Sequence, residues 1–209
     1  PDAVLTLREV SIRAGARVLI RHLDLDVRRT QTWCVLGPNG SGKSRLLRAL
    51  AGLRAPQAGS IALFGKPLAT WKARAAALKR GLLLQQHTDA FSATVLETVL
   101  VGRYPHIGRF GWESEEDTRR AGEALDRMDL AALAERDVRS LSGGERQRVA
   151  LAMLLAQGPE VFLLDEPTAH LDLAHQARLF EHLAAQVESG LRTVVFATHD
   201  FNLAARFAT

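Results

Sequence analysis

The amino-acid sequence predicts an α/β fold, with a mostly parallel sheet between helices, an antiparallel β subdomain at the N-terminal end and an α-helical subdomain. Three observations support this prediction. Two strand-like segments joined by a glycine turn open the chain, a long helical stretch fills its middle, and strands alternate with a helix near its end. With 209 residues, of which 47% are hydrophobic, the chain is long enough to bury a sizeable core.

The first half of the chain supplies the antiparallel start and the first part of the core. Residues 4–7 and 18–27 are expected to be strands, with Gly15 in the turn between them. Glycine and proline mark several of the expected element ends. The elements expected next are a strand at 32–36, a helix at 43–53 closed by Gly52 or near Pro56, a strand at 60–64, a basic helix at 71–80 and a strand at 81–84.

The second half changes from helical to mixed character. Residues 95–157 are predicted to be almost wholly helical, with breaks at 102–112 and 137–140. Strands at 161–164 and 193–198, separated by a helix at 173–187, give the βαβ alternation of a parallel sheet. We therefore expect one domain over residues 1–209, with a core of about 1–90 and 158–209 and a helical subdomain of about 91–157.

The charge pattern argues against nucleic-acid binding. The net charge is +4, but the arginines are spread along the chain and interleaved with acids, as at 113–120, without interleaved aromatic residues. A solvated surface, or contact with anionic lipid head groups, is the alternative.

Compartment and membrane topology are constrained by other features. The longest apolar runs, 150–156 and 161–164, are too short to cross a bilayer, and the N-terminal residues lack the order of a secretory signal. The single cysteine, Cys34, excludes an internal disulfide, fits a reducing cytoplasm and is expected to pack in the core.

The segment GPNGSGKS, at residues 37–44, has the pattern of a phosphate-binding loop and stands between a predicted strand and a predicted helix. Its glycines let backbone N–H groups point at phosphate oxygens, and the helix that follows adds its positive N-terminal end. Lys43 would reach the β- and γ-phosphates, and the Ser44 hydroxyl suits Mg²⁺. The predicted phosphate-binding residues are Gly37, Pro38, Asn39, Gly40, Ser41, Gly42, Lys43 and Ser44.

Two adjacent carboxylates follow the apolar strand at 161–164. In an open parallel sheet the carboxyl end of that strand lies beside the phosphate site. Asp165 is expected to hold Mg²⁺, directly or through water, and Glu166 to orient or deprotonate the attacking water. Adjacent acids at a strand end can also be solvated turn residues, and the lysine-containing loop favours the catalytic interpretation.

The segment LSGGE, at residues 141–145, precedes an apolar helix. Ser142 and Glu145 have the spacing of a capping box, and Gly143 and Gly144 expose N–H groups at the start of that helix. This makes a second anion-binding helix N-terminus on the same chain. A structural cap explains the serine and the glutamate but not the paired glycines.

With LSGGE between a phosphate loop and an LLDEP strand, the chain resembles ATP-binding cassette (ABC) ATPase subunits over essentially all 209 residues. The resemblance implies a P-loop NTPase core, MgATP hydrolysis and a head-to-tail homodimer. In that dimer Ser142, Gly143, Gly144 and the adjacent Glu145 of one subunit close on ATP held by Lys43 of the other. Residues 168–172 are similar to the dimer-contacting loop of the family, with Asp172 as its acid, and His199 matches the histidine that contacts the γ-phosphate.

The same resemblance assigns a coupling role near residue 85. Gln85 matches the glutamine that meets the Mg²⁺ and water site and senses the membrane partner, and Gln86 is the alternative. Polytopic permease subunits would dock on the helical segment, with a periplasmic or surface solute-binding protein as an indirect partner and no nucleic acid. The implied location is peripheral, at the cytoplasmic face of the bacterial inner membrane.

Residues 102–106 and the wording TAHLD resemble the branch that imports iron–siderophore, haem or vitamin B12. A soluble ABC-type ATPase acting on nucleic acid or ribosomes is the alternative. An unrelated phosphate-loop kinase is a third possibility, although it would not need LSGGE.

The sequence departs from the family pattern in three places. Residues 11–17 hold no aromatic side chain to stack on adenine, so Arg13 or Arg17 would have to stack there by a cation–π contact, or the packing is loose. Arg45 stands where a threonine commonly contacts the α-phosphate, so a guanidinium is expected at the nucleotide. The chain also stops soon after His199, which indicates a truncated or minimal member.

Overall fold

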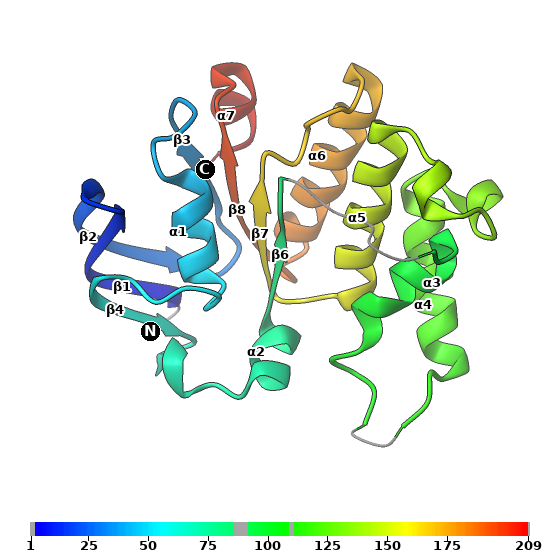
Figure 1. Cartoon of the computed structure of the whole chain (residues 1–209), viewed down its shortest axis with the longest axis horizontal. Helices are drawn as coiled ribbons and strands as arrows, with labels where there is room; N and C mark the ends of the chain where they lie inside the picture. Colours follow the sequence, from blue (N-terminus) through cyan, green and yellow to red (C-terminus); the bar gives the residue numbers. More distant parts are fainter. Residues whose placement is uncertain (1–2, 86–91, 109–110, 209) are drawn as a thin grey trace.

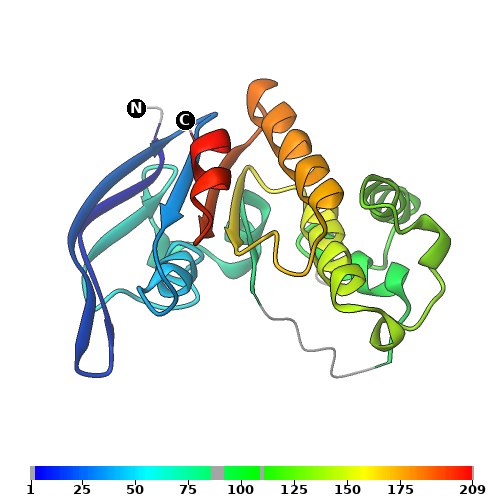
Figure 2. The same ribbon diagram turned by 90° about the horizontal axis from the view of Figure 1, so that it is seen from above.

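The computed structural model describes residues 3–85, 92–108 and 111–208 (Figure 1). Gln86, the alternative to Gln85, lies outside the described residues. An antiparallel sheet lies at one end of the molecule, a group of helices at the other, and a parallel sheet between them (Figures 1 and 2).

The antiparallel sheet has the strand order β2-β1-β4-β5. Strand β1 is much longer than the predicted 4–7, because a bulge at Glu9, with φ +52°, shifts the register between Leu7 and Val10 and keeps both of these residues buried. The bulge interrupts the alternation on which the sequence prediction relied. The strands are β1 (Ala3–Ala14), β2 (Arg17–Arg28), β4 (Ala58–Leu63) and β5 (Lys66–Pro67).

The parallel sheet has the order β3-β8-β7-β6. All residues of β7 and β8 are buried, as expected for strands covered on both faces. The register pairs Leu36 with Thr198 and Asp165 with Ala197, so the carboxyl ends of three strands meet at one edge. The strands are β3 (Thr32–Leu36), β6 (Arg80–Leu83), β7 (Val161–Asp165) and β8 (Thr193–Thr198).

Three helices flank the strands on the core side. Helix α1 (Lys43–Leu50) ends before the predicted residue 53, because Gly52 adopts φ +69° and the Leu53 N–H donates to the Arg48 carbonyl at 2.9 Å. Helix α2 (Ala73–Lys79) is shorter than the predicted 71–80, and α6 (Leu173–Glu188) lies close to its prediction.

One helix was not predicted. Helix α7 (Phe201–Phe207) follows Asp200, whose carboxylate accepts the N–H groups of Asn202 and Leu203. Phe207 stacks on Phe180 of α6, with the ring centroids 4.3 Å apart. An aspartate cap and one aromatic contact therefore anchor this short helix.

The helical part contains α3 (Val95–Leu100), α4 (Glu115–Arg127) and α5 (Gly143–Gln157). Each begins with a capping box, at Thr94, Ser114 and Ser142 respectively. Short 3₁₀ turns occupy Val101–Arg103, Ala131–Leu133 and Val138–Ser140, within or near the predicted breaks, and Leu68–Thr70. Among the described residues no helix is long and apolar enough to cross a membrane.

Two clusters of buried side chains form the core. One joins β1, β4 and α1 to one face of the parallel sheet, and the other joins the opposite face to α3–α6. Cys34 is partly buried and packs against the second cluster, where burial raises the pKa of its thiol to about 11. The predicted packing role of Cys34 agrees with this position.

Candidate functional site

The phosphate loop, residues 37–44, joins β3 to α1 at the carboxyl edge of the parallel sheet. Gly42 has φ +108°, and a Cβ there would lie 3.1 Å from the Leu19 Cβ. A side chain would therefore be both strained and crowded at this position. Gly37 starts the loop, and its N–H donates to the Thr198 carbonyl at 3.4 Å. The loop is thus tied to the end of β8.

Lys43 is buried at the first position of α1. Its ammonium group donates to the carbonyl oxygens of Gly37 at 2.6 Å and Pro38 at 3.3 Å, and lies 3.4 Å from Glu166 Oε1. Only 7% of the residue is exposed. Burying an ammonium group costs free energy unless oxygen atoms surround it. Here the loop carbonyls and Glu166 supply those oxygen atoms, so the charge is held at the carboxyl edge of the parallel sheet.

Asp165 ends β7 and faces the start of α1. Burial raises the pKa of its carboxyl above the ordinary value, the charge of Glu166 adds to this, and a hydrogen bond from Ser44 opposes it. Asp165 Oδ1 is buried without a hydrogen-bond partner. A buried carboxylate with an unused oxygen beside a serine hydroxyl is an oxygen donor set that suits Mg²⁺.

Glu166 is buried in a left-handed conformation, with φ +49°. Its N–H donates to the Ala197 carbonyl at 3.0 Å, and its Oε2 lies 3.1 Å from His199 Nδ1. A non-glycine residue in this conformation costs of order 1–3 kcal/mol and clusters at functional sites. The backbone strain and the contacts to Lys43 and His199 together fix where this carboxylate points.

A cavity of about 460 Å³ lies over the loop. It gathers Lys43, Ser44, Arg45, Gln85 and Glu166, which lie on three segments that are far apart in the sequence. Gln85 lies in a bend two residues after β6, slightly beyond the predicted strand end. The described lining residues are Ala14, Leu19, Asn39, Gly40, Gly42, Lys43, Ser44, Arg45, Gln85 and Glu166.

Ser142 to Glu145 are not among the described residues that line this cavity. The Ser142 Oγ accepts the Glu145 N–H at 3.2 Å, and Glu145 Oε2 accepts the Ser142 N–H at 2.7 Å, so the predicted capping box is formed. Ser142 and Gly143 are exposed. The start of α5 is thus available to a partner surface.

The two glycines of this segment pack against the loop at residue 170. A Cβ on Gly144 would lie 2.8 Å from the His170 carbonyl oxygen, and one on Gly143 would lie 3.7 Å from the His170 ring. His170 itself has φ +65°. Close backbone approach therefore accounts for Gly144, which a cap alone did not explain.

Replacing Gly144 by alanine is expected to destabilise the fold by about 1–3 kcal/mol, because the new Cβ displaces the His170 carbonyl. Gly122→Ala is the matched control: this glycine lies inside α4 with nothing within 4 Å of a new Cβ, so the change should stabilise by about 0.5–1 kcal/mol. Urea unfolding of the two variants should move in opposite directions. Equal stabilities would contradict the close packing at Gly144.

Asp172 is likewise outside the described cavity lining and caps α6. Its carboxylate accepts the His175 N–H at 2.9 Å, and this backbone hydrogen bond and the His175 ring hold its pKa below the ordinary value. The cap is a structural role for Asp172 beside the predicted role in dimer contact.

Comparison with known protein families decides the relationship. The ABC transporter family model matches residues 20–169, which is most of the chain. The chain belongs to the ABC transporter family. It is accordingly an ATP-binding, ABC-type ATPase, as the phosphate loop, LSGGE and LLDEP predicted.

Individual ABC proteins agree with this assignment. The hemin import ATP-binding protein HmuV of Gloeobacter violaceus is 44% identical over 95% of this chain and 74% of its own length. The iron(3+)-hydroxamate import ATP-binding protein FhuC of Bacillus subtilis is 38% identical over 98% of this chain and 76% of its own length. The predicted resemblance to this importer branch is confirmed.

A solved ABC cassette supports the fold. The ATP-binding cassette MJ0796, in a dimeric post-hydrolysis state bound to ADP and Pi, superposes with a TM-score of 0.85 at 29% identity, covering 98% of this chain and 91% of that chain. The predicted P-loop NTPase fold with an antiparallel β part and helices is confirmed. The predicted domain limits stay predictions.

Some residues around the ABC site were missed by sequence reasoning. Leu19 lines the cavity beside the phosphate loop, and Gln147, buried on α5, donates from Nε2 to the Pro167 carbonyl at 3.1 Å. This bond links the LSGGE helix to the loop after Glu166. The sequence around Leu19 shows only the alternation of a strand, which does not indicate a site. Gln147 lies inside a predicted helix, where a glutamine is usually a surface residue.

Proposed function

We propose that this chain is the ATP-hydrolysing motor subunit of an ABC importer. It binds and hydrolyses MgATP in a head-to-tail dimer and drives uptake of a metal chelate, either iron–siderophore, haem or cobalamin, through partner membrane subunits. The observation that carries the proposal is the joining of Lys43, Glu166 and His199 at one strand edge, in a chain whose relatives are import ATP-binding proteins.

The phosphate loop binds the triphosphate in this proposal. Backbone N–H groups of residues 39–44 would surround the β-phosphate, and Lys43 would exchange its contacts with the loop carbonyls for contacts with phosphate oxygens. Ser44, Asp165 and Gln85 would hold Mg²⁺, which neutralises the charge that develops on the phosphates.

Glu166 and His199 act on the attacking water. Glu166 is the carboxylate that orients or deprotonates it, and His199 stabilises this arrangement through the contact between its Nδ1 and Glu166 Oε2. The left-handed backbone at Glu166 supports this role, because it directs the carboxylate toward His199 and Lys43 at the end of β7.

The dimer supplies the second half of the ATP site. The exposed start of α5, with Ser142, Gly143, Gly144 and Glu145, would close on the γ-phosphate bound by the other subunit. Asp172, at the start of α6, would contact the partner. Two ATP molecules between the subunits then stabilise the dimer by mass action.

Membrane partners complete the proposed importer. Polytopic permease subunits would dock near Gln85 and the helical part, and a periplasmic or surface solute-binding protein would deliver the chelate to them. The motor subunit would lie peripherally at the cytoplasmic face of the inner membrane. No nucleic acid is required.

Replacing Asp165 by asparagine is expected to raise the melting temperature of the nucleotide-free protein by a few degrees, because burial penalises the charged carboxylate. Since the pKa of Asp165 is raised, that penalty is present above the folded pKa and disappears as the pH falls below the ordinary value. The difference in melting temperature between the variant and the wild type should therefore decrease as the pH falls. The extra stabilisation that Mg²⁺ gives in the presence of ATP should be lost, and its retention would contradict the Mg²⁺ assignment.

Arg45→Thr is expected to change ATP affinity by several-fold without weakening Mg²⁺ binding, because Arg45 lines the cavity and places a guanidinium where the family has a hydroxyl. Arg54→Thr, a change of the same kind at an exposed site outside the described lining, is the control. Fluorescent-nucleotide titration measures both. An affinity unchanged from wild type would refute a role for Arg45.

The base site gives a related expectation. Ala14 and Leu19 are the cavity residues from the first two strands, and the Arg13 guanidinium donates to the Ala16 carbonyl at 2.9 Å, which holds it at the hairpin turn. Arg17 is therefore the better of the two predicted residues for contact with the base.

Co-purification tests the importer proposal directly. The tagged chain, expressed in its native host, should carry a polytopic membrane protein through detergent extraction, and the purified complex should hydrolyse ATP. Stimulation of ATP hydrolysis by nucleic acid or ribosomes, with no membrane partner, would instead favour a soluble ABC-type ATPase.

A further inference from the structure

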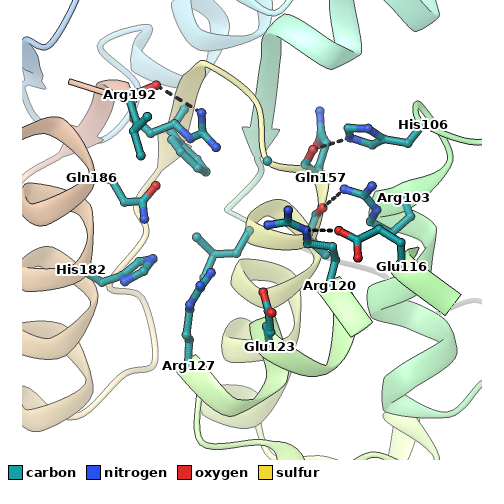
Figure 3. Close-up of a pocket in the computed structure, with 15 residues that line it drawn as sticks. Arg103, His106, Glu116, Arg120, Glu123, Arg127, Gln157, His182, Gln186 and Arg192 are labelled. Carbon is teal, nitrogen blue, oxygen red and sulfur yellow. Dashed lines mark hydrogen bonds and ion pairs between the residues drawn. The ribbon is translucent and has the colours of Figure 1, made fainter. Parts of the chain in front are cut away.

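A second cavity, of about 470 Å³, lies between α4 and α6, beside the C-terminal end of α5 (Figure 3). Its described lining residues include none of those that line the phosphate-loop cavity. In Figure 3 His182 and Gln186 project from α6 toward Arg127 and Arg120 of α4. We call this space the α4–α6 cleft.

The α4–α6 cleft is rich in arginine. Its described lining holds four arginines, Arg103, Arg120, Arg127 and Arg192, against two glutamates, Glu116 and Glu123. The two glutamates are already paired. Glu116 accepts from Arg119 and Arg120 at 2.6 and 2.8 Å, and Glu123 pairs with Arg119, which is outside the lining.

Arg103 is also paired. Its Nε donates to Asp117 at 2.9 Å, and its guanidinium donates to the Ala156 carbonyl at the end of α5 at 2.7 Å. The hydrogen bonds from Ser114, with help from Arg103, hold the pKa of Asp117 at about 2. The Arg103 guanidinium is therefore held in place by Asp117 and the end of α5. Because its charge is already paired, it contributes little to binding another anion.

Arg127 and Arg192 are different. Neither forms an ion pair with any described carboxylate. Arg192 donates from one terminal nitrogen to its neighbouring Leu191 carbonyl at 3.2 Å, and its Nε is buried without a partner. Glu160 attracts it from a distance, but that carboxylate is bonded to Lys79 and Arg29.

Like charges face one another across the cleft. Burial lowers the pKa of Arg192, and Arg120 of α4 lowers it further, while Glu160 opposes the shift. Burial likewise lowers the pKa of His182, and Arg127 adds to the effect. His182 Nε2 is buried without a hydrogen-bond partner. The cleft thus concentrates positive charge and unused donors between two elements.

We propose that the α4–α6 cleft binds a small multivalent anion that carries phosphate or carboxylate groups, held between Arg127 of α4 and Arg192 before β8. Guanidinium groups bind both kinds of anion through paired N–H donors. The ring N–H of His182 and the amide of Gln186 add neutral donors. The volume is that of a small-molecule site, so a soluble ligand fits better than a protein segment.

Such an anion would tether α4 to the loop that enters the parallel sheet. It would neutralise the repulsion between Arg120 and Arg192, which is otherwise a cost of keeping the two elements together. The site is independent of the phosphate loop, so the inference holds whether or not the proposed import function is correct.

The test uses the full chain in saturating MgADP, so that the phosphate loop is occupied. Fructose 1,6-bisphosphate serves as the phosphate probe and tricarballylate as the carboxylate probe, each against chloride at equal ionic strength. Calorimetry should detect binding of at least one probe, and the amide resonances of Gly158 and Arg192 should shift. Arg127→Gln and Arg192→Gln should each weaken this binding about tenfold or more.

Arg178→Gln is the matched control, because Arg178 lies on α6 outside the described lining and pairs with Asp129. It should leave probe binding unchanged, and unchanged MgADP affinity should show that all three variants are folded. Three results with the free probes would overturn the proposal: no binding of either probe, equal weakening by Arg178→Gln, or resonance shifts confined to residues 37–44. Arginine-dependent binding to phosphatidylglycerol vesicles without binding of free probes would also overturn it, in favour of a lipid surface.

Discussion

Glu166→Gln is expected to abolish ATP turnover while ATP binding is retained. The substitution keeps the shape of a side chain that is buried between Lys43 and His199 but removes its capacity to accept a proton. General base catalysis contributes about 10²–10⁴-fold to a rate, so phosphate release should fall by that factor. Because ATP is bound and not consumed, the variant should accumulate as a dimer in MgATP, measurable by size-exclusion chromatography with light scattering.

Glu160→Gln is the matched control for this experiment. Glu160 is the residue before β7, at the opposite end of this strand from Glu166. It pairs with Lys79 and Arg29, away from the phosphate loop. Its variant should hydrolyse ATP at the wild-type rate and remain monomeric when ATP is exhausted. Normal hydrolysis by the Glu166 variant would remove Glu166 from the activating role, and a variant that binds ATP but never dimerises would contradict the head-to-tail dimer.

Lys43→Ala should eliminate measurable nucleotide binding at micromolar concentrations. Lys43 is the buried cation of the phosphate loop, and hydrogen bonds from a charged group contribute about 1.5–3 kcal/mol each. Loss of contacts to two phosphates should therefore lower ATP affinity on the order of a hundredfold or more. Equilibrium dialysis with labelled ATP gives the affinity directly.

Lys72→Ala provides the comparison, since Lys72 is exposed and precedes α2 without a side-chain cap. Its ATP affinity should equal that of the wild type. The folding of the Lys43 variant must also be checked. Without the lysine ammonium group, Glu166 stays buried and, among the described residues, keeps only His199 as an ionic contact. Wild-type far-UV circular dichroism together with retained affinity would show that residues 37–44 do not bind the phosphates.

The central strands and the phosphate loop could be predicted because their determinants are local. An apolar run followed by glycines and Lys43 specifies a strand, a loop and a helix, and the parallel register then places Asp165 and Glu166 beside it. The cap at Ser142 was equally local, since Glu145 lies three residues away.

What could not be predicted depends on contacts between distant segments. The extension of β1 past Glu9 needs Asp24 to accept the Glu9 N–H at 2.8 Å, and alternation alone ends the strand at Leu7. The close approach of Gly144 to His170 joins the first turn of α5 to a loop that lies 26 positions later in the sequence. The α4–α6 cleft joins residues from four parts of the chain, and no spacing in the sequence indicates it.

The partly buried Cys34 has a practical consequence. With a pKa of about 11, only about one thiol in 10⁴ is ionised at neutral pH, and thiolate is the form that reacts with maleimides. The chain carries no other cysteine. Spectroscopic labels or cross-linkers can therefore be attached to engineered cysteines on the LSGGE helix or on α4 in the native background, and subunit closure during the ATP cycle can be followed with little reaction at Cys34.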